Sequence, residues 1–270
     1  MDVRDLLVLV EGEATATAPY ALSMGLHLKA HLTAVAFVQQ RPSVGPFAEL
    51  PHNLLEAMYE ESCRAAERAL ERFRGTGFSW VETELMTVPA GQSAEDRFRW
   101  LARHFDLTIV QQRAPDGPVN DSTVEAVLFG SGRPVLVVPY VHAAPARFGT
   151  VLVAWDESAT AARAIGDALP LLKLADRVDV VTIAEPRRRE RVSPPARLAE
   201  HLQRHGLEAT FTLLPPAGGS AETLLSRAAD MGADLLVMGG YGHSRLRELV
   251  LGGTTRTVLA SMTVPTLMAH

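Results

Sequence analysis

The sequence has almost no cysteine and no excess of positive charge. Cys63 is its single cysteine in 270 residues, which excludes an internal disulfide and a zinc site built from cysteines. Its 26 Lys and Arg residues are outnumbered by 31 Asp and Glu residues, so the net charge is −5. Without an overall positive field, the chain is not expected to bind nucleic acid.

Long apolar runs and a secretory start are also missing. No apolar stretch approaches the roughly 20 residues that span a bilayer. The first residues place Asp2 and Asp5 where a signal peptide carries basic residues. These absences predict a cytoplasmic protein without a membrane partner. The composition, 47% hydrophobic and 21% charged, is typical of a folded globular chain, and the length favours two domains.

What the chain does contain is a repeat. Two apolar strands that end in an acid, 5–11 and 150–156, are each followed by an Ala- and Leu-rich helix and a second apolar strand. Further matches pair Gly91–Glu95 with Gly218–Glu222, Phe105–Leu107 with Ala233–Leu235, and Pro134 with Pro265. Ser93 and Ser220 are the predicted N-caps of the helices that follow the first of these matches.

Continuous apolar strands that alternate with helices indicate a parallel sheet covered on both faces. The sequence therefore predicts an α/β fold with two repeated, doubly wound, five-stranded domains at 1–139 and 150–270. Residues 140–149 are the predicted linker. The first half has about 18 more residues before its Gly-Ser turn (145 − 127), which we place in the 39–53 loop and a longer helix at 54–73.

A glycine-rich segment, residues 235–257, follows the fourth strand of the second half. Glycines at a strand exit let the backbone approach a ligand closely, and paired glycines before a helix leave N–H groups free to face an anion. The spacing is neither that of a P-loop nor that of a Rossmann fingerprint. The pattern reads Gly239-x2-Gly242-x9-Gly252-Gly253, and Asp156 follows the first strand of the same half.

This pattern, combined with the strand and helix order and the repeat, resembles the universal stress protein family in its tandem form. The resemblance implies a strand order of 3-2-1-4-5 and domains that pair about a two-fold axis. It also implies a site for ATP or another adenine nucleotide, with the glycine segment around the ribose and phosphates. By position, the nucleotide-binding residues would be Ala154, Asp156, Ile183, Met238, Gly239, Gly242, Gly252, Gly253 and Thr254.

Two departures from the family pattern bear on this site. Gly253 stands where the family has Ser or Thr, so Thr254 or Thr255 would have to supply the hydroxyl. The first half has no Gly-x2-Gly after its fourth strand, and Glu11 replaces the Asp. We therefore expect a structural role for the first half rather than a ligand site of its own.

Other candidate sites have plainer explanations. His201 and His205 are four apart on a predicted helix and could share a metal, but two surface histidines are the simpler interpretation. The basic run 187–191 fits a solvated loop, and Cys63 has no neighbouring His that would activate it. Residues His243, Arg245 and Arg247, inside the glycine segment, could reach a phosphate or pair with Glu248.

The sequence thus predicts a cytoplasmic stress-response protein that is not an enzyme. Its second half would bind an adenine nucleotide, if any ligand, without a dedicated catalytic group or a metal. The two repeats would pair within the chain, and a homodimer of chains is a further possibility. The alternatives are a hydrolase of nucleotide phosphates in the same α/β group, and an interaction scaffold that holds no ligand.

Overall fold

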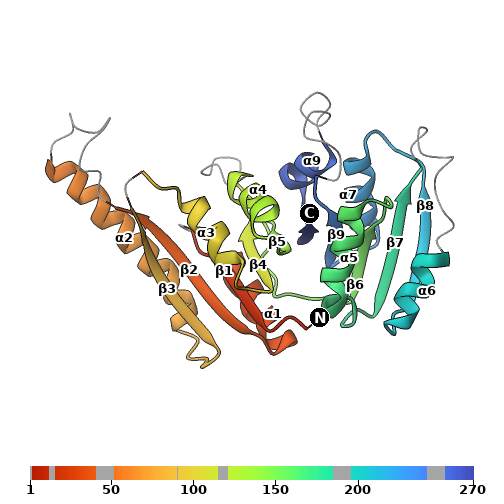
Figure 1. The fold of residues 1–270 in the computed structure, drawn as a ribbon, viewed down its shortest axis with the longest axis horizontal. Helices are drawn as coiled ribbons and strands as arrows, with labels where there is room; N and C mark the ends of the chain where they lie inside the picture. The colour runs from red at the N-terminus through yellow and green to blue at the C-terminus, as the bar shows by residue number, and fades with distance from the viewer. Residues whose placement is uncertain are drawn as a thin grey trace.

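The computed structural model describes residues 2–11, 16–40, 52–89, 91–114, 121–184, 196–241 and 253–270. Strands alternate with helices through both halves (Figure 1). The first half contains β1 (Asp5–Leu9), α1 (Thr17–Leu28), β2 (His31–Gln39), α2 (His52–Arg74), β3 (Val81–Val88), α3 (Ala94–Ala102), β4 (Leu107–Gln111), α4 (Asp121–Gly130) and β5 (Val135–Val138). The second contains β6 (Thr150–Ala154), α5 (Ala159–Leu172), β7 (Arg177–Ile183), α6 (Ala196–Arg204), β8 (Ala209–Leu214), α7 (Ser220–Asp230), β9 (Leu235–Gly239), α9 (Thr254–Ser261) and β10 (Thr266–Ala269).

All ten described strands belong to one sheet, in the order β3-β2-β1-β4-β5-β10-β9-β6-β7-β8. Within each half the described neighbours are parallel, and the order is 3-2-1-4-5 in both. The predicted α/β fold class is therefore confirmed. The expected pair of sheets is, in addition, fused edge to edge into a single one.

The fusion occurs where β5 pairs with β10, which is antiparallel, unlike the other described strand pairs. Leu136 lies opposite Leu267, and each is the repeat equivalent of the other (267 − 136 = 131, the offset from Pro134 to Pro265). A local two-fold axis therefore passes through this pair. Both strands are buried along their whole length, so the pairing covers two edges that would otherwise expose apolar backbone.

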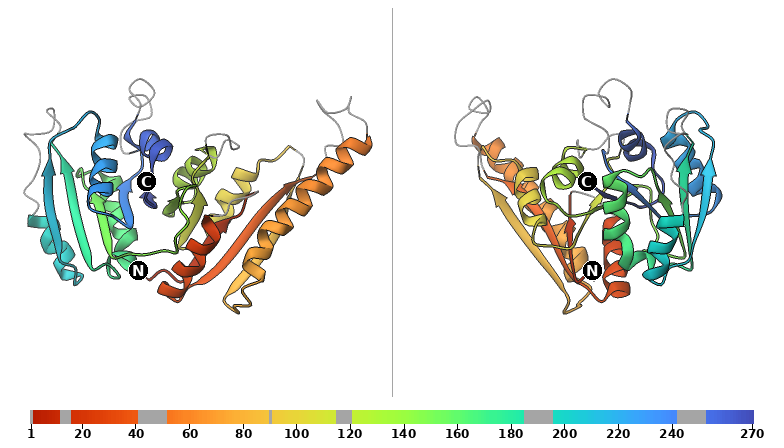
Figure 2. Two further views of the ribbon diagram at one scale, coloured as in Figure 1. Left: turned by 180° about the vertical axis from the view of Figure 1, so that it is seen from behind. Right: turned by 45° about the vertical axis from the view of Figure 1, so that its right-hand side comes forward.

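Helices cover both faces of the sheet (Figure 2). Along β1, Leu6 and Val8 belong to one buried cluster and Leu7 and Leu9 to another, because successive side chains point to opposite faces. The first cluster takes in α1, α2, α5 and α6, and the second takes in α3, α4, α7 and α9. Each cluster runs through both halves, so the core is continuous across the seam.

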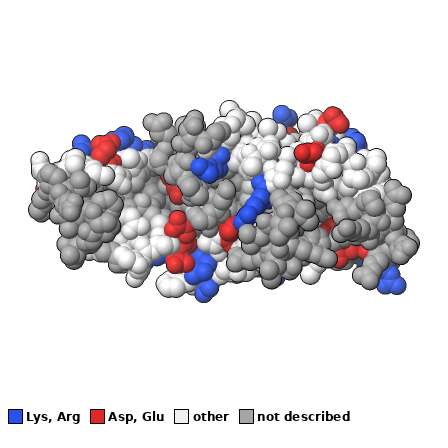
Figure 3. Space-filling view, turned by 90° about the horizontal axis from the view of Figure 1, so that it is seen from above, with Lys and Arg blue, Asp and Glu red and all other residues white. Residues whose placement is uncertain are grey.

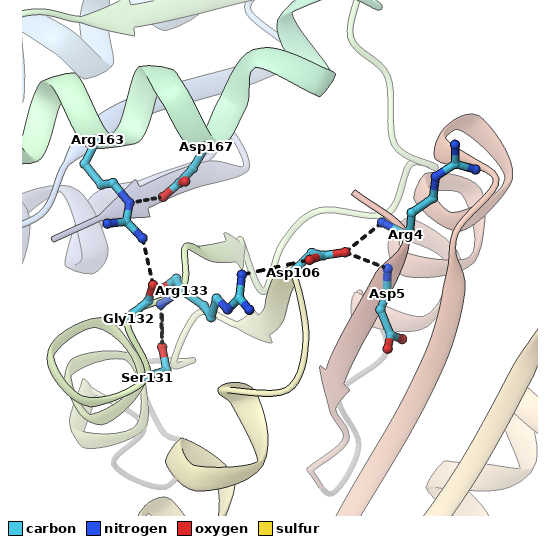
Figure 4. Close-up of polar contacts among 8 residues, drawn as sticks. All are labelled: Arg4, Asp5, Asp106, Ser131, Gly132, Arg133, Arg163 and Asp167. Carbon is cyan, nitrogen blue, oxygen red and sulfur yellow. Dashed lines mark hydrogen bonds and ion pairs between the residues drawn. The ribbon is translucent and has the colours of Figure 1, made fainter. Parts of the chain in front are cut away.

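The repeated Phe/Ala-Asp-Leu motif has a structural explanation at the amino ends of the strands. The Asp106 carboxylate accepts the Asp5 N–H at 3.1 Å, and the Asp234 carboxylate accepts the Thr150 N–H at 2.9 Å. Each Asp thus ties the start of the fourth strand to the start of the first. Figure 4 shows Asp106 in these contacts, beside the bond from Arg163 of the second half to the Gly132 carbonyl of the first, at 2.8 Å.

Local predictions from the sequence hold with one exception. Ser93 caps α3, since its Oγ accepts the Asp96 N–H at 3.0 Å, and α2 is a long helix of 23 residues against nine in α6. The prediction that Ser220 caps α7 is wrong by one residue. Gly219 is the N-cap, and its own N–H donates to Glu222 Oε2 at 3.1 Å, which is the glutamate half of a capping box. In the part of the chain that the structure describes, no helix is long and apolar enough to cross a bilayer.

Gln112 is a buried polar residue at the seam between the halves. It directly follows β4, is 4% exposed, and donates from Nε2 to the Leu259 carbonyl of α9 at 2.8 Å. Leu259 lies in the last turn of α9, where carbonyl groups have no partner within the helix. The first half therefore caps the end of a second-half helix.

We predict that Gln112→Ala lowers the free energy of unfolding by about 1–2 kcal/mol, because the Leu259 carbonyl loses a buried donor. Urea denaturation monitored by circular dichroism measures this loss. The control is Gln203→Ala, at an exposed residue of α6. It should leave the midpoint of urea unfolding nearly unchanged. Equal midpoints for the two variants would show that the Gln112 contact contributes nothing.

His142, in the segment that joins the halves, packs edge-on against Tyr20 of α1, with ring centroids 5.4 Å apart. Burial lowers the pKa of His142 below its ordinary value of 6.5, and the backbone at Ala144 and the charge of Asp234 oppose the shift only in part. The unfolded chain therefore takes up this proton at a higher pH than the folded one does. The contribution of neutral, buried His142 to the free energy of unfolding is complete above pH 6.5. It decreases as the pH falls below 6.5 towards the lowered pKa of the folded state.

We predict that His142→Phe reduces this acid sensitivity, since the ring remains but cannot be protonated. The advantage of the wild-type protein over the variant in unfolding free energy should shrink as the pH falls below about 6.5. Urea titrations at several pH values between neutral and mildly acidic measure the difference. His205→Phe, on an exposed residue after α6, serves as the control and should follow the wild-type pH dependence.

Candidate functional site

The strand order of the second half reverses between β6 and β9, the inner pair of its sheet. From β6 the chain continues into α5 on one face, and α9, which precedes β10, covers the other. In open α/β sheets, ligands bind outside the carboxyl ends of the strands at this switch point. In Figure 3, which looks down on the molecule of Figure 1, acidic and basic side chains are interspersed over the coloured part of the surface.

The predicted site residues that the structure describes gather at this edge. Ala154, Ile183 and Gly239 end β6, β7 and β9, and Asp156 lies two residues beyond Ala154. Gly253 and Thr254 begin α9. Met238 is 4% exposed and packs in the core, so its backbone rather than its side chain faces the edge. Gly242 and Gly252 lie outside the described residues.

The turn from β6 into α5 is held by side chains on its own backbone. Asp156 Oδ1 accepts the Ser158 N–H at 3.0 Å, and Ser158 Oγ caps α5 by accepting the Ala161 N–H at 3.1 Å. Between these residues, Glu157 adopts a left-handed φ of 62°. Asp156 is therefore engaged in shaping the turn, a task that the sequence pattern alone does not reveal.

Gly239 fits closely against the start of α5. A Cβ atom at this position would lie 2.6 Å from the Ala161 nitrogen and 2.6 Å from Thr160 Oγ1. Only glycine lets the end of β9 approach the first turn of α5 this tightly. This close approach is the physical role of the first motif glycine.

The N-terminus of α9 has no side-chain cap. Gly253 is the N-cap in an extended conformation and, because it has no side chain, it supplies no cap hydrogen bond to the first turn. Of the two hydroxyls that could replace the family's Ser or Thr, Thr255 is buried, and its Oγ1 accepts the Tyr241 N–H at 3.0 Å. Thr254 is half-buried at the edge. The geometry thus favours Thr254 over Thr255 for contact with a ligand.

Residues of the first half support the start of the glycine segment. Tyr241 takes a left-handed φ of 52°, and its hydroxyl donates to Glu125 of α4 at 2.7 Å. Burial raises the pKa of the Tyr241 phenol, and the adjoining Glu125 carboxylate raises it further. Gly240 lies against Leu128 of the same helix, which a Cβ would meet at 2.5 Å. Sequence reasoning missed these contacts because they join residues more than 110 positions apart.

In the first half, two glutamines occupy the positions of the glycines. The strand register aligns Gln111 with Gly239 and Gln112 with Gly240. Gln111 Oε1 accepts the Ala16 N–H at 3.4 Å, at the N-cap of α1, and Gln112 is engaged with α9 as described above. At these two positions the first half therefore has side chains that bond to neighbouring helices, whereas glycine in the second half lets the backbone approach its neighbours closely.

The remaining candidates gain little from the structure. The rings of His201 and His205 pack edge to face, with centroids 4.8 Å apart. Among the described residues, no three His, Cys, Asp or Glu side chains are grouped to hold a metal ion. Cys63 is half-buried on α2. The basic run 187–191 and residues 243, 245 and 247 lie outside the described residues.

A sheet with this strand order, covered by helices on both faces and with glycine at the carboxyl end of its fourth strand, defines the doubly wound α/β class of ligand-binding domains. Residues 147–270 match the model of the universal stress protein family. The second half of the chain therefore contains a universal stress protein domain.

Individual relatives agree with this assignment. The chain is 30% identical over 169 residues to a universal stress protein of Synechocystis sp., and the match covers 60% of this chain and 57% of that protein. The chain thus spans little more than half of that relative.

Solved structures show the same fold along the whole chain. A universal stress protein from Archaeoglobus fulgidus DSM 4304 has a TM-score of 0.75 at 15% identity, covering 99% of this chain and 96% of its own. A functionally unknown protein from Pseudomonas aeruginosa PAO1 has a TM-score of 0.62 at 18% identity, covering 99% and 92%. At these identities the likeness establishes the fold alone.

We predict that Gly239→Ala destabilises the protein by about 1–3 kcal/mol, because the new methyl group overlaps the first turn of α5. Gly166→Ala is the matched control: within α5, its Cβ would meet nothing within 4 Å. That change should stabilise the helix by about 0.5–1 kcal/mol. Thermal and urea unfolding of the two variants test the close approach, and similar effects in both would contradict it.

Proposed function

We propose that the second half binds an adenine nucleotide at its switch point, and that binding without a dedicated catalytic step is its contribution to a stress response. The phosphates would face the N-terminus of α9, and the adenosine moiety would lie near the turn after β6. The observation that carries this proposal is the N-terminus of α9 at the carboxyl edge, where the N-cap Gly253 has no capping side chain. Helix N-termini with free N–H groups favour anions.

The electrostatics of the chain support a local rather than a global mode of phosphate binding. The net charge is −5, so a phosphate gains nothing from the overall field. Backbone N–H groups and the helix dipole act over a few ångströms and do not require it. Gly239 supports the site indirectly, because it lets the end of β9 pack against the first turn of α5.

ATP is the first ligand to test, because the family pattern in this half is that of its ATP-binding members. cAMP is the second, because one solved universal stress protein is described as a complex with cAMP, a statement about that protein. Isothermal titration of the full chain, purified without added nucleotide, measures both affinities. Chromatography of the recovered nucleotide shows whether it stays intact, and conversion to ADP would favour the hydrolase alternative.

Two substitutions at one position separate anion binding from helix capping. Gly253→Ser restores the hydroxyl of the family pattern, and we predict about tenfold tighter ATP binding through a charge-assisted hydrogen bond. Gly253→Asp also supplies an N-cap side chain but places a carboxylate beside the phosphates, and we predict about tenfold weaker binding.

Both variants should keep or slightly raise the stability of α9, because Ser and Asp are better N-caps than glycine. If ATP affinity only followed the stability of α9, both variants would change the affinity in the same direction. Opposite changes would show that the phosphates lie beside position 253. If neither the wild-type protein nor Gly253→Ser shows heat or a thermal shift with millimolar ATP, the nucleotide proposal fails and the ligand-free scaffold is favoured.

A further inference from the structure

The first half contains a cavity of about 240 Å³ at the carboxyl ends of β1 and β2. It is enclosed by α2 and by the first turns of α3 and α4. Its apolar walls come from both strands and from α2 and α3, through Leu9, Val10, Phe37, Ala65, Ala66 and Phe98. This is the part of the molecule for which the sequence predicts a purely structural role.

The cavity occupies the same place in its half as the proposed nucleotide site does in the other. The strand registers align Leu9 with Ala154, Glu11 with Asp156 and Phe37 with Ile183. The offset of 131 at the end of each half aligns Thr123, on the cavity wall, with Thr254. The first half therefore has a cavity at its switch point, where the second half has the proposed nucleotide site. The residues that line the two places differ in chemistry.

The walls of this cavity are suited to an apolar or aromatic body. Phe37 and Phe98 meet edge to face, with ring centroids 6.1 Å apart and planes at 82°. Phe98 is 1% exposed and rigidly packed, whereas Phe37 is half-buried. The volume of the cavity is below the usual range of about 300–1,000 Å³ for sites of drug-sized ligands. The cavity therefore accepts only a small molecule.

The polar groups on the walls have one sign of charge. Glu11, Glu95, Ser62 and Thr123 line the cavity, and no Lys, Arg or His is among its described lining residues. Glu11 is already engaged in another interaction, so the charge offered to a ligand is that of Glu95. A phosphate or carboxylate ligand would meet the like charge of Glu95 here. An ammonium group would be attracted by the Glu95 carboxylate and by the faces of the aromatic rings.

One feature of the other site, Gly239, is replaced in this one, and the start of α3, which borders the cavity, has its own cap. Gln111 stands in place of Gly239, and its side chain accepts the Ala16 N–H. Ser93 caps α3, so the Asp96 N–H of its first turn is already satisfied. The described walls therefore disfavour a nucleotide in the mode proposed for the second half.

We propose that the first half binds a small organic ammonium compound with an apolar or aromatic body in this cavity. The site is distinct from the nucleotide site of the second half and does not depend on it. The carboxylate of Glu95 pairs with the ammonium group, and the two phenylalanines contact the apolar body.

Three probes of the same shape and different charge test the charge preference. 2-Phenylethylammonium, 2-phenylethanol and phenylacetate share a ring and differ at the end of the chain. Titration of the full protein, followed by methyl and amide NMR shifts, should show binding in that order, with phenylacetate weakest. Equal affinities, tighter binding of phenylacetate, or no shifts for the ammonium probe in the millimolar range would overturn the proposal.

Two variants test whether the ammonium probe binds in this cavity. Glu95→Gln should weaken 2-phenylethylammonium about fivefold and leave 2-phenylethanol unchanged, because only the charge is removed. Ala65→Leu, on a helix that tolerates leucine well, fills the cavity and should abolish binding of both probes. Glu208→Gln, an exposed residue before β8, is the charge control.

Circular dichroism and thermal unfolding confirm that each variant is folded before its affinity is compared. ATP titrations of the same variants should be unaffected, which separates this site from the second half. Unchanged ammonium binding in both Glu95→Gln and Ala65→Leu would show that the probe binds elsewhere, and the assignment of the cavity would then be wrong.

Discussion

The antiparallel hydrogen bonds between β5 and β10 are the interaction on which the rest of the structure depends. They join two five-stranded halves into one sheet and set a local two-fold axis through Leu136 and Leu267. Both strands are buried at every position. Without the other half, the sheet edge formed by β5 or by β10 would be exposed. The continuous clusters on the two faces follow from this pairing, since the cores of the halves meet at the same seam.

The seam also explains why the two halves have diverged. Gln112, Glu125 and Leu128 of the first half contact Leu259, Tyr241 and Gly240 of the second. A glycine at position 112 would remove the donor that caps α9. The glycine pattern lost from the first half is thus replaced by side chains that support the second half, and the cavity at the first switch point keeps a different set of walls.

The sequence predicted the fold well because local signals and the repeat agree. Apolar strands such as 107–111 and 235–239 are continuous, and Ser93 stands at a helix start, so period and capping indicate the same elements. The fusion of the halves into one sheet is not local, and no periodicity in β5 distinguishes an antiparallel from a parallel neighbour. The Ser220 prediction failed because α7 begins one residue earlier than the motif suggests: Gly219 is the N-cap, and Glu222 accepts its N–H.

The candidate site was predictable only where it rests on short motifs. Gly239, Gly253 and Thr254 lie at the expected edge. Tyr241 is held by α4, and the half-buried Arg227 of α7 bonds the buried Asp179 of β7 at 2.6 Å. These contacts join positions 48 to 116 residues apart. A single sequence carries no signal for pairs at such separations.

The separation of Leu136 from Leu267 along the chain has a consequence for the order of folding. Within each half, strand pairs are linked by one helix or lie a few elements apart, whereas the seam closes a loop of 131 residues (267 − 136). Within the first half, β1 already pairs with β4 across 101 residues (107 − 6), so the loop-closure cost of the seam is larger by only about 0.2 kcal/mol. Synthesis sets the order instead, because β10 follows every strand of the first half. Each half can complete its parallel pairs first, and the apolar edges of β5 and β10 then stay exposed until they meet. During synthesis, the edge of β5 therefore stays uncovered until β10 has left the ribosome.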